Sequence, residues 1–248
     1  MIKKLCYTKE LYSSLIILTL LNFSGVCQNI STEKNNYQVV FGSEYMDAVN
    51  FLRTEKGLID SLATFGVDPD FTISIVFPEI LRYSAIRDWA ETKAIEVLYT
   101  QYGNKYADFS IGRFQMKPTF AEEIERQWNL HLQHLNPNSK LPGKFAINES
   151  ENSRYERLKR LNDINWQLKY LAMFKILIEQ KFKENKWSDI QSKLHFFATA
   201  YNSGFMKEYS SLLSSETHND FYTGILKPSI CYNYGNIAVD YFLKYRIL

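Results

Sequence analysis

Long stretches of the chain place apolar residues at the spacing of an α-helix, with few helix breakers between them. The clearest stretch follows the charge-rich residues 150–163 and aligns on one face Trp166, Tyr170, Leu171, Phe174, Leu177 and Ile178. Only six Pro and ten Gly occur in 248 residues, whereas an architecture of many short strands needs frequent turns. We therefore predict a mainly α protein, a single domain of packed helices.

Capping residues and breakers predict where individual helices begin and end. Ser43 is a candidate cap for a helix over about 44–63. Asp68-Pro69 opens the next helix, with Asp as the N-cap and Pro in the first helical position. Pro78 should kink that helix. Further helices are expected over about 84–102, 119–134, 166–178 and 236–244, with another that ends at Ser203-Gly204, and a loop is expected over 136–148.

The first residues have the composition of an export signal. A Lys-bearing leader precedes the apolar run Leu15–Phe23, which is too short to span a bilayer as a mature helix. Small residues ahead of Gln28 predict cleavage after Cys27. We expect a signal peptide over 1–27, a flexible lead-in over 28–42 and the folded domain over 43–248. A retained membrane anchor, and a lipoprotein acylated at Cys27, are the alternatives.

Charge and histidine spacing exclude two classes of partner. Cleavage after Cys27 removes three Lys and one Glu, which lowers the formal net charge from +2 to about zero. A nucleic-acid partner is therefore not expected, because such proteins neutralise phosphates with a basic surface. The four His lack the spacing of metal ligands, and His131 and His134 are expected on the surface. We expect a monomer without metal or cofactor.

Glu79 is the first candidate for chemistry. It lies at the edge of the helical stripe formed by Ile73, Val76, Phe77 and Ile80. A carboxyl group beside apolar side chains loses water, which raises its pKa and lets it act as a general acid near neutral pH. The competing interpretation is a Glu that points to solvent from the flank of the helix.

Two amides and several aromatic residues are candidates for ligand binding. Gln115 and Asn202 lie close to the turn-forming residues Gly112 and Gly204, and their amides suit sugar hydroxyl and N-acetyl groups. Flat surfaces for sugar rings could come from Phe114, Tyr201, Tyr232 and Tyr234. For each aromatic residue, packing in the core is the alternative.

Three blocks occur in a familiar order. The first is Val67-Asp68-Pro69 with an apolar helix that reaches Glu79; the second is Gly112–Pro118, "GRFQMKP"; the third is Ala200–Gly204, "AYNSG", preceded by Tyr170-Leu171. With these blocks the chain resembles the soluble, lysozyme-like lytic transglycosylases, which cleave the glycan strands of peptidoglycan. The resemblance spans about residues 67–204, with Tyr232 or Tyr234 as a less secure match to a late Tyr.

The resemblance implies a lysozyme-like fold with a substrate cleft, in the periplasm or cell envelope of a bacterium. It implies that Glu79 donates a proton to the bond between N-acetylmuramic acid and N-acetylglucosamine and then acts as a base, so that a 1,6-anhydro product forms. Substrate-binding roles would fall to Gln115, Phe114, Tyr201, Asn202 and Tyr234.

The chain departs from the family pattern at several positions. Ile80 stands where the family usually has Ser, Pro78 is unusual, and Arg113 replaces an apolar residue. The spacing from Glu79 to Gly112 is long, which predicts an extra helix over or beside the cleft. These departures keep open a non-catalytic peptidoglycan-binding protein. A hydrolytic, goose-type-like lysozyme is the other alternative, in which Asp108 would hold a water molecule instead of capping the next turn.

Overall fold

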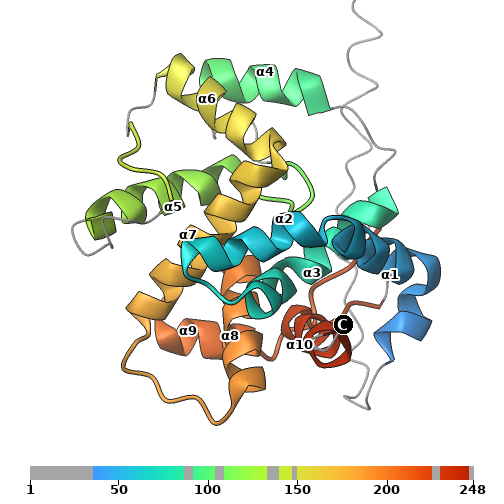
Figure 1. Ribbon diagram of the computed structural model, residues 1–248. Coiled ribbons are helices and arrows are strands. Elements are labelled where there is room, and N and C mark those ends of the chain that lie inside the picture. The colour runs from blue at the N-terminus through green and yellow to red at the C-terminus, as the bar shows by residue number, and fades with distance from the viewer. Residues whose placement is uncertain are drawn as a thin grey trace, which may run out of the picture.

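The computed structural model describes residues 36–86, 92–103, 109–132, 140–146, 150–224 and 230–245. These residues contain ten α-helices and isolated bridges but no extended strand, which confirms the mainly α class (Figure 1). None of the described helices has the length and apolar character needed to cross a membrane. The helices are α1 Tyr37–Thr54, α2 Lys56–Asp60, α3 Pro69–Ile86, α4 Thr92–Tyr102, α5 Pro118–His131, α6 Glu151–Asn162, α7 Ile164–Lys181, α8 Ile190–Ser203, α9 Tyr209–Ser215 and α10 Tyr234–Tyr245, with a 3-10 helix η1 at Ser61–Phe65.

Helix α3 is the central element of the fold. It packs against α1, α8 and α10 (Figure 1). Every residue from Phe71 to Leu81 is buried. A helix that is covered on all sides carries any polar side chain into the interior. Glu79 is therefore buried because of its place on α3, and it is not a solvent-facing residue on a helix flank.

The start of α3 is formed by local capping, as predicted. The Asp68 Oδ1 atom accepts a hydrogen bond of 2.7 Å from the backbone N–H of Phe71, and Pro69 is the first helical residue. The helix then continues across Pro78 to Ile86. The predicted start of a new helix at Ser84 is wrong, because the Ser84 hydroxyl donates to the carbonyl of Ile80 within α3 instead of capping a new helix.

The N-terminal boundary differs from the prediction. Helix α1 begins at Tyr37, inside the expected flexible lead-in, and it bends at Gly42, whose φ is +50°. Tyr37 and Phe41 are buried and pack edge-on against Tyr232 near the other end of the chain. This contact joins residues almost 200 positions apart, so the local pattern could not indicate it. Residues 1–35, including the predicted signal peptide and Cys27, lie outside the described residues.

One cysteine bears on the predicted cleavage. Cys231 is disulfide-bonded, and the two other cysteines of the chain, Cys6 and Cys27, lie outside the described residues. Cleavage after Cys27 would remove both of them. The intact mass of the mature protein therefore distinguishes cleavage at this position from a chain that keeps the disulfide.

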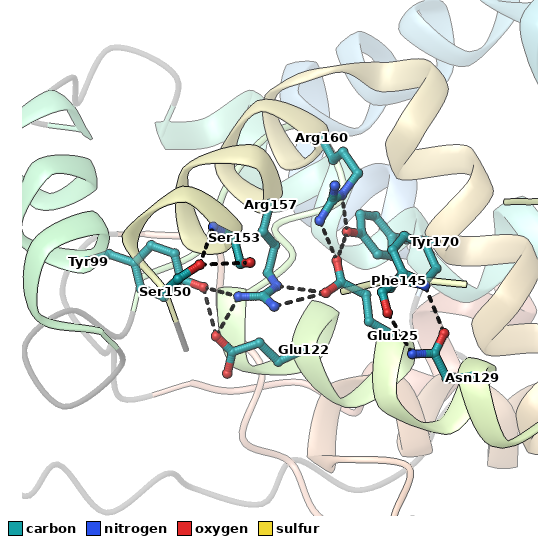
Figure 2. Close-up of polar contacts among 10 residues, drawn as sticks. All are labelled: Tyr99, Glu122, Glu125, Asn129, Phe145, Ser150, Ser153, Arg157, Arg160 and Tyr170. Atoms are coloured by element: carbon teal, nitrogen blue, oxygen red, sulfur yellow. Dashed lines mark hydrogen bonds and ion pairs between the residues drawn. The ribbon is translucent and has the colours of Figure 1, made fainter. Parts of the chain in front are cut away.

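Two helices, α6 and α9, were not predicted. Helix α6 covers the charge-rich segment, and two of its arginines, the buried Arg157 and the partly buried Arg160, belong to a network of ion pairs (Figure 2). Arg157 binds Glu122 at 2.7 Å and Glu125 at 2.9 Å, and it donates to the Tyr99 hydroxyl at 2.7 Å. A buried charge is stable only when it is paired in this way. One side of α6 therefore faces the core, although its sequence is rich in charged residues.

The same network continues to helix α7. Arg160 binds the second carboxylate oxygen of Glu125 at 2.9 Å, and the Tyr170 hydroxyl donates to that same oxygen (Figure 2). Four helices, α4 to α7, are thus joined through one buried carboxylate and its partners. This assembly supports α5, whose N-terminus follows directly on the "GRFQMKP" segment.

Candidate functional site

A cleft of about 450 Å³ opens between α3, the segment before α5, and the C-terminal end of α8. Four residues that the sequence singled out border it: Glu79, Gln115, Tyr201 and Asn202. The remaining lining residues are Arg82, Ser110, Met116, Lys117, Thr119, Phe120, Glu123, Ser203, Gly204, Phe205, Met206 and Lys207. The first and third sequence blocks, which lie more than 120 residues apart, thus meet at one cavity with the second.

Glu79 is the buried acid of this cleft. The residue is 5% exposed, and its Oε2 atom accepts no hydrogen bond of good geometry within the described residues. Arg82 Nη1 lies 3.2 Å from Oε2 and 3.5 Å from Oε1. Burial raises the pKa of Glu79 to about 7, against the opposing effect of the cations of Arg82 and Lys117. Both protonation states of this carboxyl are therefore accessible near neutral pH.

The "GRFQMKP" block forms a tight turn that Gly112 makes possible. Ile111 and Met116 exchange two backbone hydrogen bonds, of 2.9 and 3.1 Å, across the turn. Gly112 has a φ of +70°, and a Cβ atom there would lie 1.8 Å from Nε2 of Gln167. Glycine is required at this position both by the backbone conformation and by the close approach of Gln167.

Gln167 holds the turn from α7 and was not singled out in the sequence. Its Oε1 accepts from the backbone N–H of Phe114 at 2.9 Å, and its Nε2 donates to the carbonyl of Leu161 at 2.7 Å. The residue is 2% exposed. A Gln at a core-facing position beside Leu168 and Leu171 was the available sequence signal, because a buried amide must be hydrogen-bonded.

Gln115 borders the cleft in a strained backbone conformation. It has a φ of +48°, the only positive value among the described residues other than glycine. Its side-chain Nε2 donates to the carbonyl of Gly112 at 2.9 Å, which closes the turn. The amide nitrogen is thus engaged by the protein, and the amide oxygen remains as the acceptor for a ligand. A strained residue beside a cleft is typical of functional sites.

Phe114 does not have the position that the sequence analysis expected. Its side chain is 1% exposed and does not border the cleft, so the predicted sugar platform at this residue is wrong. The turn directs the ring into the core, where it is among the largest fully buried side chains. Its backbone carbonyl instead accepts a hydrogen bond of 2.8 Å from the Tyr201 hydroxyl.

Tyr201 and Tyr234 lie near Glu79, and both are buried. Burial, and then the charge of Glu79, raise the pKa of each phenol well above its usual range. The Tyr234 hydroxyl is buried and has no hydrogen-bond partner within the described residues. Of the two late tyrosines, Tyr234 is thus the one next to the acid, since Tyr232 packs against Tyr37 and Phe41.

A polar network fixes the segment that carries Tyr234. The Asn233 side chain caps α10 by accepting from the backbone N–H of Asn236 at 2.9 Å, and it donates to the carbonyls of Glu216 and His218. The His195 ring lies 3.0 Å from the same Asn233 oxygen and 2.8 Å from a Glu216 carboxylate oxygen. The position of Tyr234 therefore depends on contacts from α8 and from the end of α9.

A second cavity of about 220 Å³ adjoins the cleft. It is bordered by Tyr234 and shares Asn202, Ser203 and Lys207 with the larger cavity. Asn202 is exposed and contributes to both. Its side chain is therefore placed to contact a ligand that extends along the cleft toward Tyr234.

Two departures from the family pattern have a structural explanation. The Arg113 guanidinium lies 4.4 Å from the ring centroids of both Phe51 and Tyr83, between α1 and α3, and it does not border the cleft. Ile80 is fully buried in the core. Neither residue borders the cavity. Asp108 lies outside the described residues.

A second carboxylate at the cleft, Glu123, is held by its neighbours. Its two carboxylate oxygens accept from Arg126 at 2.6 and 3.0 Å, and one of them also accepts from Gln127 at 2.8 Å. Of the two carboxyls that border the cleft in the described part of the chain, Glu79 is the buried one, and its pKa is raised to about 7.

No cluster of His, Cys, Asp and Glu in the described residues could hold a metal ion. Comparison of the chain with protein-family models, with curated proteins and with solved structures finds no match. The chemistry of the cleft must therefore indicate the function.

Proposed function

We propose that this protein is a peptidoglycan lytic transglycosylase with a lysozyme-like fold. It cleaves the β-1,4 bond between N-acetylmuramic acid and N-acetylglucosamine and leaves a 1,6-anhydro ring on the muramic acid. The observation that carries this proposal is Glu79: one buried, hydrogen-bond-deficient carboxyl at the base of a cleft, with its pKa raised to about 7. The order of the three sequence blocks around that cleft supports the assignment.

The proposed reaction uses Glu79 twice. The protonated carboxyl donates its proton to the glycosidic oxygen while the bond from that oxygen to the muramoyl C1 atom breaks, with help from the oxygen of the muramoyl acetamido group. The resulting carboxylate then removes the proton from the 6-hydroxyl, whose oxygen forms the new bond to C1. The carboxyl ends in its starting state, and no water is consumed.

Transfer to the 6-hydroxyl needs only one carboxyl, which Glu79 supplies in the described part of the cleft. Inverting hydrolysis needs a second carboxylate that activates water on the opposite face of the sugar. Glu123, the other carboxylate among the described residues of the cleft, is tied to Arg126 and Gln127. One carboxyl with a pKa near 7 suffices for the acid and base steps of transglycosylation, since it is half ionised near neutral pH.

The other residues bind and orient the glycan. The Gln115 amide oxygen and the Asn202 amide are suited to the N–H and carbonyl of acetamido groups. The Tyr234 hydroxyl is buried and has no partner within the described residues, so it would gain a hydrogen bond from a bound sugar. The cleft volume of about 450 Å³ lies within the range of small-ligand sites and accommodates part of a glycan strand.

The substrate implies the location and the partner. Peptidoglycan lies outside the cytoplasmic membrane, and the N-terminal residues 1–27 have the features of a signal peptide. We therefore place the protein in the periplasm or cell envelope, with glycan strands as its partner.

Replacement of the acid tests the proposal. Glu79→Gln keeps the volume of the side chain but has no proton to give, so release of soluble fragments from purified peptidoglycan should stop. Glu156→Gln, on the exposed side of α6, is the matched control and should digest like the wild type. Equal digestion by Glu79→Gln would refute the assignment of the acid.

A further inference from the structure

Arg82 joins the candidate acid to the segment that precedes Tyr234. It follows Glu79 by one turn of α3, and its Nη1 atom lies 3.2 Å from Oε2 of that residue. Its Nε donates to the carbonyl of Tyr222 at 3.1 Å, and its guanidinium lies 4.3 Å from the centre of the Phe221 ring. The Arg82 side chain is 25% exposed, and the residue borders the cleft.

These contacts hold the guanidinium in one place. A planar guanidinium that stacks on a ring and donates to a fixed carbonyl loses most of its rotational freedom. Phe221 is itself fixed, since it exchanges two backbone hydrogen bonds with Tyr232 and packs edge-on against Tyr234. The charge is therefore fixed relative to the Glu79 carboxyl from the side of the C-terminal segment.

We propose that Arg82 is a positioning residue that supplies the countercharge for the ionised form of Glu79. This inference rests on the proposed function, in which Glu79 must pass through a buried carboxylate state between its two proton transfers. A buried carboxylate without a cation is strongly disfavoured. Arg82 stabilises this state without sharing the proton, because a guanidinium stays charged at every pH of interest.

Five further charged or titratable side chains lie around Glu79 or border its cleft. Lys117 precedes α5 and acts in the same direction as Arg82 but more weakly. Glu123 on α5 is held by Arg126, and Lys207 after α8 borders the outer cleft. Tyr201 on α8 and Tyr234 on α10 are buried phenols whose raised pKa keeps them neutral. Arg82 is thus the cation closest to the carboxyl among the described residues.

The inference can be tested without turnover, by titration of Glu79 itself. In protein labelled with ¹³C at the Glu side chains, the Glu79 signal is identified by its loss in Glu79→Gln. The wild-type midpoint should lie near the pKa of about 7. Arg82→Gln keeps hydrogen-bonding capacity but removes the charge, so the midpoint should rise by about one pH unit or more. Arg82→Lys keeps the charge, so its midpoint should stay within about half a unit of the wild type.

A matched control separates local charge from net charge. Lys159→Gln removes one positive charge from an exposed position on α6 and should leave the Glu79 midpoint unchanged. An unchanged or lowered midpoint in Arg82→Gln would overturn the inference. If Arg82→Gln does not fold, as judged by thermal unfolding, Arg82→Met provides the same comparison.

Kinetics then link the charge to the reaction. The alkaline limb of the pH profile of kcat/KM should move upward with the titration midpoint in Arg82→Gln, and the maximal kcat should fall about tenfold or more. Arg82→Lys should restore the position of the limb. A purely structural role would lower activity without moving the limb, and that result would contradict the inference. A wild-type protein that forms no product would refute the proposed function, whereas the titration would still test Arg82.

Discussion

The hydroxyl of Tyr201 donates a hydrogen bond of 2.8 Å to the backbone carbonyl of Phe114, which ties the end of α8 to the turn before α5. Both residues are buried, and they lie 87 positions apart in the chain. The same turn carries Gln115, and the next residue of α8 is Asn202. One hydrogen bond therefore sets the spacing of the two amides that we assign to substrate binding.

Loss of this hydrogen bond should weaken both fold and activity. Tyr201→Phe leaves the buried carbonyl of Phe114 without its donor, which should cost about 1–3 kcal/mol in the free energy of unfolding. Activity should fall by about tenfold, because Gln115 and Asn202 lose their relative placement. Urea denaturation and muropeptide release measure the two effects. Tyr155→Phe, at a half-exposed tyrosine on α6, is the control and should change neither.

Replacement of Gly112 should be among the most damaging single changes in the turn. In Gly112→Ala, the added Cβ would meet Gln167 at 1.8 Å in addition to the strain of a positive φ. Gly66→Ala is the matched control, since Gly66 also has a positive φ, of +82°, but nothing lies within 4 Å of its Cβ position. We expect about 1 kcal/mol of destabilisation at Gly66 and at least about twice that at Gly112.

A double variant tests the cause of that difference. Gln167→Ala removes the atoms that the new Cβ would meet, so Gly112→Ala should cost much less in that background than in the wild type. Equal costs in both backgrounds would show that Gln167 is not the obstacle.

The buried ion network should contribute strongly to stability. Glu125 accepts from Arg157, Arg160 and Tyr170, so Glu125→Leu would remove the carboxylate that Arg160 binds and one of the two that Arg157 binds. Removal of one partner from such a network costs about 3–5 kcal/mol. Glu156→Leu, at an exposed ion pair on α6, should cost less than about 1 kcal/mol. Comparable unfolding midpoints for the two variants would contradict this role of the network.

Glu79 should make stability depend on pH in a defined window. Its pKa is raised from 4.5 to about 7 in the folded protein, so the folded state binds more protons than the unfolded state between these values. The free energy of unfolding should therefore fall as pH rises from about 4.5 to 7, by about 3 kcal/mol from this group alone. Glu79→Gln has no carboxyl at this position, so it should not show this fall. The free energy of unfolding of the variant minus that of the wild type should therefore rise as pH rises from about 4.5 to 7 and stay constant above pH 7.

Local signals in the sequence predicted much of the fold. The Asp68 cap, Pro69 and Pro118 act within one helical turn, and they placed the starts of α3 and α5 correctly. The starts of α1 and of α6 were missed for a shared reason. Tyr37 and Phe41 are buried against the C-terminal segment, and Arg157 of α6 is buried against carboxylates on α5. Such partners lie far away in the chain and leave no local pattern.

The candidate site was predictable to a similar extent. Glu79, Gln115, Tyr201 and Asn202 meet at the cleft, as their types and order indicated. Phe114 was assigned the wrong role because a sequence does not show which side of a turn a ring takes. The pairing of Arg82 with Glu79 could have been predicted from the sequence, because side chains three residues apart on a helix lie within reach of each other. Asp108, which distinguishes the two enzyme hypotheses in the sequence, lies outside the described residues.

Mass spectrometry of peptidoglycan digested by the purified wild-type protein is the most direct test of the central claim. The account predicts muropeptides that end in 1,6-anhydro-N-acetylmuramic acid, 18 Da lighter than the hydrolysis products because no water is added, and none from Glu79→Gln. Muropeptides with reducing ends would identify a hydrolase instead. The absence of any soluble product from the wild type would contradict an enzymatic role for this cleft.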